Sequence, residues 1–222
     1  MRYFKVFVVF LFVCLVILSG CNKDDDNGPT GPSHGLSAET YMPLKVGATW
    51  TYKLIGTVQG EVFTDTTTVT IVGTTTISEN NKTYFVMGES DEESIYLRIE
   101  NNIVYQFSPG EFQELPYCNF NKEVGQSWEM WNESNPLGSM ILTGKFLGTE
   151  NITVPAGAFT NCAKFDITSN VIFLNNSGEV SESFEGTGIV WLAPNVGIVK
   201  STEDNEMMGT STEELITYSI PE

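Results

Sequence analysis

From residue 41 onward, apolar and polar positions alternate repeatedly along the chain. Residues 50–54 read apolar, polar, apolar, polar, apolar, and the pattern returns at 95–99 and within 140–146. Side chains of a strand point alternately to its two faces, so each run predicts a half-buried β-strand. Helical periodicity is missing from every longer segment, and only residues 37–41 suggest a short helical turn.

Turn-forming residues separate these runs. Asn- and Gly-rich breaks occur at residues 79–81, 101–102 and 175–178, and Pro194-Asn195-Val196-Gly197 predicts a hairpin between strands at 186–193 and 197–203. The expected fold is all-β: an antiparallel meander that forms a barrel, a half-barrel or a sandwich. A closed or packed sheet would also protect the strand edges.

A weak internal repeat suggests two duplicated halves. Val46-Gly47-Ala48-Thr49-Trp50 matches Val124-Gly125-Gln126-Ser127-Trp128, and residues 71–74 match residues 146–149 in the same order. Two landmarks at nearly the same offset are typical of a duplicated unit, although short pairs also arise by chance. In each half a glycine turn would lead into a strand that carries tryptophan.

The N-terminus has the pattern of a secretory signal. Arg2 and Lys5 precede an apolar run from Val6 to Leu18. The run is shorter than the roughly 20 residues that a membrane-spanning helix needs. Leu18-Ser19-Gly20-Cys21 resembles the bacterial lipobox, which implies that residues 1–20 are a lipoprotein signal peptide and that Cys21 is lipidated. An ordinary signal peptide with a chance cysteine is the less favoured alternative.

Residues 21–38 then form a tether rich in Asp, Gly and Pro, which also contains the only histidine, His34. A single β-rich domain is expected over residues 39–222. Asn22-Lys23-Asp24-Asp25-Asp26 resembles the export signal of Bacteroidetes surface lipoproteins, and a solvated acidic spacer is the equal alternative. The expected location is the cell envelope, at the outer membrane, with surface exposure left open.

Three motifs resemble a known group. They are residues 41–52, 154–162 and 191–200, with Pro155-Ala156-Gly157 and Pro194-Asn195-Val196-Gly197 as their turns. Together they are similar to uncharacterised, Bacteroidetes-like bacterial envelope lipoproteins with an all-β, open-barrel-like domain. The resemblance implies fold and location, and it implies no activity.

The amino-acid composition limits the classes of molecule that the protein can bind. The formal net charge is −17, so we expect no binding to nucleic acid, which requires basic clusters. The membrane would be reached through the N-terminal lipid, since stable anchoring takes two or more acyl chains. An apolar content of 41% is sufficient for a real core.

Catalytic signatures are missing from the sequence. One histidine in the tether cannot build a Ser-His-Asp triad or a multi-histidine metal site, and no P-loop or G-x-S-x-G elbow occurs, so we expect no cofactor and no metal. The acidic runs 91–93 and 203–206 lack EF-hand spacing and are interpreted as solvated loops.

Two pairs of residues remain as candidates, one for contact with a ligand and one for a disulfide bond. Trp128 and Trp131 have opposite parity, so one of them should be exposed as a ligand-facing aromatic unless a bulge intervenes; burial of both in the core is the favoured alternative. Cys118 and Cys162 could form a disulfide, because parity places Cys162 on the polar face; two independent thiols are the alternative.

The sequence therefore predicts a lipid-anchored outer-membrane lipoprotein that acts as a non-enzymatic binding or structural module. Its ligand would be a hydrophobe, a glycan or a protein. The alternative function is a carboxylate-dependent, glycan-active enzyme of the cell envelope, although 28 acidic residues give no basis for choosing a catalytic pair.

Overall fold

The computed structural model describes residues 35–88, 94–108, 113–175, 177–206 and 209–222. The predicted signal peptide, Cys21 and the export motif lie outside these residues. In chain order the elements are α1 (Ala38–Tyr41), β1 (Thr49–Val58), β2 (Glu61–Ile77), β3 (Lys82–Gly88), β4 (Ile95–Glu100), β5 (Ile103–Ser108), β6 (Gln113–Asn119), β7 (Ser127–Asn135), β8 (Gly138–Val154), β9 (Gly157–Leu174), β10 (Val180–Ala193), β11 (Gly197–Asn205) and β12 (Gly209–Ser219).

The twelve strands form one antiparallel sheet. Their order is β6-β5-β4-β3-β2-β1-β12-β11-β10-β9-β8-β7, so the chain crosses once from one edge of the sheet to the other, between β6 and β7. The predicted all-β antiparallel meander is confirmed, as are the helical turn at α1 and the β10–β11 hairpin. Within the described residues, no helix has the length and apolar character to span a membrane.

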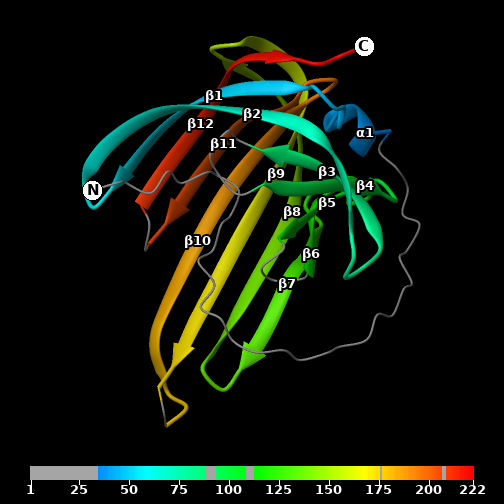
Figure 1. Ribbon diagram of the computed structural model, residues 1–222. Coiled ribbons are helices and arrows are strands. Elements are labelled where there is room, and N and C mark those ends of the chain that lie inside the picture. Colours follow the sequence, from blue (N-terminus) through cyan, green and yellow to red (C-terminus); the bar gives the residue numbers. More distant parts are fainter. Residues whose placement is uncertain (1–34, 89–93, 109–112, 176, 207–208) are drawn as a thin grey trace.

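The sheet curls into a nearly closed barrel (Figure 1). Its two edges, β6 and β7, come into contact, and the indole N–H of Trp128 on β7 donates a 2.6 Å hydrogen bond to the carbonyl of Pro116 on β6. Proline has no N–H to offer a further strand and is therefore suited to an edge. A side chain thus links the two edges at this point.

Both halves begin with the same hairpin. The backbone N–H of Gly47 donates to the carbonyl of Ile71 at 2.8 Å, and the N–H of Gly125 donates to that of Phe146 at 2.7 Å. A register shift follows directly after each of these acceptors, in the β2–β3 and β8–β9 pairs. The weak repeat of the sequence therefore corresponds to two hairpins with matching hydrogen bonds and bulges.

The short helix α1 lies at one end of the barrel, called here the α1 end (Figure 1). The side chain of Asn102 accepts from the N–H of Ala38 at 2.7 Å and donates to the carbonyl of Leu36 at 3.1 Å. The N–H of Asn195, in the β10–β11 turn, donates to the carbonyl of Thr40 at 2.6 Å. The segment before β1 is thus fixed to two turns of the domain.

Aromatic side chains continue from α1 into the core. The ring of Tyr41 lies 5.4 Å from that of Phe120, which in turn lies 5.1 Å from Phe165. These side chains fill the interior at the α1 end. The β7–β8 and β9–β10 turns lie at the opposite end, called here the far end (Figure 1).

Candidate functional site

The sheet has two chemically different faces. On β1 the buried Trp50, Tyr52 and Leu54 alternate with the more exposed Thr51 and Lys53. The buried set belongs to the face that carries most of the core, called here the inner face. Strand pairing extends this face across β2 and β7–β12, where it divides into an apolar and a polar part.

The apolar part lies on β7–β10. Cross-strand pairing aligns Trp128 with Gly144, Gly144 with Ile167, and Ile167 with Gly188. A Cβ atom added at Gly144 would lie only 2.2 Å from the indole of Trp128, so this glycine makes room for the ring. We call this part, together with Trp131 and its neighbours on β8 and β9, the apolar wall.

A β-bulge on β7 decides where the two tryptophans point. The register shifts between Glu129 and Trp131, so Met130 is the extra residue and the alternation restarts. Trp128 and Trp131 are therefore both buried, with exposed fractions of 7% and 6%, and neither is an exposed platform. Among the described residues, the indole N–H of Trp131 is the one buried side-chain donor without a hydrogen-bond partner.

The polar part lies on β11 and β12 and is called here the polar strip. Ser201 pairs across the sheet with Glu213, and Glu203 pairs with Ser211. Each serine hydroxyl donates to the glutamate opposite, at 3.4 Å in both cases. The two carboxylates thus occupy diagonal positions on neighbouring strands, a placement that separates Cα atoms by about 7 to 8 Å.

These acids lie in a poorly solvated environment. Burial raises the pKa of Glu203, and the hydrogen bond from Ser211 offsets part of that rise. Tyr117 reaches them from β6: burial raises its pKa, and the charges of Cys118, Glu203 and Glu213 raise it further. Tyr117 on β6 and the polar strip therefore lie close enough for their charges to interact.

Burial of the inner face decreases with distance from α1. Side chains of the inner face are buried near α1, as at Tyr52 and Leu54, whereas Phe63, Glu203 and Ser211 nearer the far end are only partly buried. A ligand entering from the far end would meet the polar strip and the apolar wall together.

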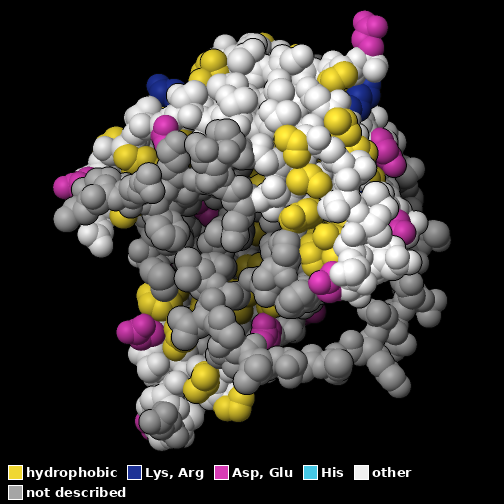
Figure 2. Space-filling view, viewed as in Figure 1, with side chains coloured by type: hydrophobic (Ala, Val, Ile, Leu, Met, Phe, Trp, Pro, Cys, Tyr) yellow, Lys and Arg dark blue, Asp and Glu magenta, His cyan; other side chains and the backbone are white. Residues whose placement is uncertain are grey.

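The described basic residues of the barrel strands all point away from the inner face. Lys164 and Lys200 lie on the outer face, with their amino groups 5.1 and 6.0 Å from the ring of Trp191. Lys145 pairs with Asp166 and Lys53 with Glu214, also outside. The face seen in Figure 2 carries scattered acidic side chains, with Lys and Arg only near its upper edge.

Arg98 belongs to a separate ion-pair cluster on β3–β6. It lies on the face of β4 opposite to Leu97 and Ile99 and donates to Glu114 through two nitrogens, one of them at 2.8 Å. Lys82 also binds Glu114, at 2.5 Å. All these groups neutralise one another, so the cluster is explained as a stabilising network.

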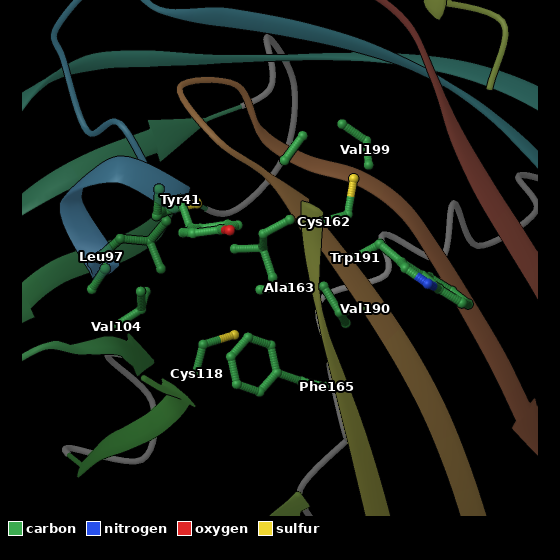
Figure 3. Close-up of a cluster of buried hydrophobic side chains, with 14 of the residues drawn as sticks. Tyr41, Leu97, Val104, Cys118, Cys162, Ala163, Phe165, Val190, Trp191 and Val199 are labelled. Atoms are coloured by element: carbon green, nitrogen blue, oxygen red, sulfur yellow. The ribbon is translucent and has the colours of Figure 1, made fainter. Parts of the chain in front are cut away.

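The two cysteines are free thiols with different neighbours. Cys118 and Cys162 both have exposed fractions of 0%. In Figure 3 Cys118 lies toward Phe165, whereas Cys162 lies toward Val199. The disulfide was expected because parity placed the Cys162 thiol on the exposed, polar face. In the structure this thiol is buried.

The acidic run 203–206 is not a solvated loop. Its first three residues belong to β11, which turns Glu203 and Asn205 inward and Asp204 outward. No group of three or more His, Cys, Asp or Glu in the described ranges is placed to hold a metal ion. The other run, 91–93, lies outside these ranges. The alternation that continues from Val199 could have placed Glu203 on the inner face from sequence.

Comparison with known proteins adds a family match. Residues 109–213 match the DUF3108-like family. The match extends from β6 into β12 and therefore includes the apolar wall and the polar strip. A search of curated proteins gave no match.

Solved structures that are similar to this chain include the following three proteins. A "putative lipoprotein" from Parabacteroides distasonis is 17% identical over 81% of this chain and 98% of its own, with a TM-score of 0.48. A "putative exported protein" with a YmcC-like fold from Bacteroides fragilis is 16% identical over 82% and 99%, with a TM-score of 0.43. A LolA superfamily protein from Nitrosomonas europaea is 9% identical over 84% and 90%, with a TM-score of 0.30.

Proposed function

We propose that this protein is a lipid-anchored envelope protein whose domain is a non-enzymatic binding module, with an amphipathic ligand on the inner face of the barrel. The observation that carries the proposal is the unpartnered indole N–H of Trp131 on that face. Leaving a buried donor unsatisfied costs about 1 to 3 kcal/mol. An acceptor on a bound ligand would remove this cost.

The surroundings of Trp131 define the ligand's general character. The apolar wall would cover a hydrocarbon or ring body, and the polar strip would face a group that forms hydrogen bonds. Pockets of this mixed kind are typical of small-molecule sites. The partly buried residues at the far end would be the route of entry.

Binding of the fluorescent dye prodan tests this proposal. Prodan is an uncharged naphthalene ketone with one carbonyl acceptor, and its fluorescence emission shifts when this carbonyl accepts a hydrogen bond. Titration of the purified protein should show saturable binding, and Trp131→Phe should weaken it about 5- to 10-fold, the value of one hydrogen bond. Trp191→Phe is the matched control, since this indole lies on the outer face and donates to Glu150. Equal affinity in all three proteins would reject the site.

The anchor has its own test. Cys21→Ser should move the protein from the membrane fraction to the soluble fraction or block its processing, because acylation requires the thiol. Unchanged membrane retention with an unchanged N-terminal mass would contradict lipid anchoring.

Glycan hydrolysis is the second candidate function, and Glu203 and Glu213 favour it. Glutamates whose Cα atoms lie diagonally, about 7 to 8 Å apart, can bring their carboxyl groups to the separations used by glycosidases, and the raised pKa of Glu203 suits a general acid. Release of reducing ends from envelope polysaccharide, lost in both Glu203→Gln and Glu213→Gln, would support it. If the unaltered protein releases no reducing ends, glycan hydrolysis is rejected and the binding module remains the proposed function.

A further inference from the structure

We infer that the ligand of the inner face is an uncharged, straight-chain carbonyl compound, such as a ketone or an ester. Its oxygen accepts from the indole N–H of Trp131, and its hydrocarbon chain extends from there toward the far end. This inference rests on the proposed function and adds the chemical class and the orientation of the ligand.

A stripe of apolar side chains leads from Trp131 toward the far end along β8, β9 and β10. Its first residue, Leu142, pairs across the strands with Trp131. The next inner-face side chains pair in one row across all three strands, and the two aromatic rings at the end of the stripe have centroids 6.1 Å apart. The members of this far-end stripe are Leu142, Met140, Val171, Phe184 and Phe173.

The far-end stripe is long and narrow. Ser169 pairs with Leu142, and Phe173 lies four residues further along β9, so the stripe is about 13 Å long, the length of roughly ten methylene groups. On the β7 side its neighbour is the exposed Glu133, and on the other side β11 ends at Asn205, before the stripe does. A single extended hydrocarbon chain fits this shape.

Burial decreases along the stripe. Leu142 and Val171 have exposed fractions of 4% and 6%, whereas Phe173 at the end is 37% exposed. The strands β7–β10 extend beyond the others at the far end, so the end of the stripe is open (Figure 1). A chain lying on the stripe would cover the ring of Phe173, and burial of this apolar surface favours binding.

The row that contains Trp131 limits the head group to an uncharged acceptor. Leu142, Ser169 and Gly186 follow Trp131 in this row, and none of them carries a charge. The hydroxyl of Ser169 is directed at the carbonyl of Gly186, at 3.5 Å. A carboxylate beside Trp131 would exchange its hydration for a neutral N–H, which is costly, whereas a ketone or ester oxygen is satisfied by one donor.

Displacement of bound prodan by methyl ketones of increasing length tests the inference. From methyl pentyl to methyl heptyl to methyl nonyl ketone, the affinity should rise about 2- to 4-fold per methylene, because each addition buries more of the chain on the stripe. Dipentyl ketone is the matched control, since it is an isomer of methyl nonyl ketone with its carbonyl at the centre. It should bind at least about 5-fold more weakly, and this difference should disappear in Trp131→Phe.

Two variants locate the chain on the stripe. Phe173→Ala and Phe184→Ala should weaken binding of methyl nonyl ketone about 5-fold and that of methyl pentyl ketone less than about 2-fold, because only the longer chain reaches these rings. Ile141→Ala is the control and should change neither affinity, since this residue is 41% exposed and lies on the outer face, between Met140 and Leu142.

The outcomes separate this inference from the proposed function. Prodan binding that depends on Trp131, together with no gain from chain length or equal affinities for the two isomers, would overturn the inference and leave the binding site standing. Equal weakening of the short and the long methyl ketone in Phe173→Ala and Phe184→Ala would also overturn it. If prodan itself shows no saturable binding, the proposed function is rejected and the inference with it.

Discussion

Glu114 is the carboxylate with the most partners in the described structure, and its role is to stabilise the sheet. Burial alone would raise its pKa, but hydrogen bonds from Arg98, Lys82 and Tyr84 outweigh burial and hold the pKa at about 2. Because this pKa lies below the unfolded value, the stabilisation is complete above about pH 4.5 and is lost as the pH falls toward 2.

Glu114→Gln should therefore lower the free energy of unfolding at pH 7 by roughly 2 to 4 kcal/mol, since Arg98 would lose a buried partner. The difference between variant and unaltered protein should shrink as the pH drops from 4.5 to 2. Glu100→Gln is the control: Glu100 binds the same arginine but is 53% exposed, so its loss should cost about 1 kcal/mol or less. Urea unfolding across this pH range measures both, and equal losses would contradict the account.

The two thiols allow a second test at the level of single residues. Burial raises the pKa of both Cys118 and Cys162, which makes them poorly reactive in the folded protein. A thiol reagent should modify neither cysteine under native conditions and both after unfolding without reductant. An unfolded, unreduced domain without free thiols would instead establish the disulfide.

At the scale of elements, the side chain of Asn102 holds the segment before β1 more than the short helix α1 does. Asn102 makes two hydrogen bonds to this segment and has a positive φ of 61°, which Gly also tolerates. Asn102→Gly should thus remove both bonds without backbone strain and destabilise the segment by about 1 to 3 kcal/mol.

Hydrogen exchange of residues 36–42 measures this effect directly, and their amides should exchange faster in Asn102→Gly. Asn101→Gly is the control, because Asn101 lies in the same turn with a φ of 50°. Unchanged exchange in Asn102→Gly would show that packing of Tyr41 and Met42 holds the segment without these bonds.

Sequence periodicity predicted the strands well, because each strand has one buried face and one more exposed face. It predicted less well where the period breaks. The bulge at Met130 turns Trp131 inward, and Cys162 is buried although it has the parity of the outward-facing Lys164. Nothing in the local composition signals such extra residues, so parity counted through them assigns the wrong face.

For the whole molecule, strand order was the feature that the sequence could not supply. The meander and the two matching hairpins follow from turn residues and from the repeat, but the pairing of β1 with β12 joins residues from opposite ends of the domain. That pairing completes the inner face, because it brings the polar strip next to β1 and β2. The candidate site therefore depends on long-range contacts: the alternation from Val199 can assign Glu203 to the inner face, but only the pairing of β1 with β12 brings the polar strip beside β1 and β2.

The four tryptophans provide the most direct test of the inner face as a binding surface. Trp50, Trp128 and Trp191 donate to Val196, Pro116 and Glu150, whereas the Trp131 indole has no partner. In a nitrogen–proton correlation spectrum the Trp131 indole signal, assigned by its loss in Trp131→Phe, should move downfield when prodan is added, because the indole N–H gains the ketone as an acceptor. The Trp191 signal should stay in place. Saturable prodan binding that leaves the Trp131 signal unmoved would contradict the account.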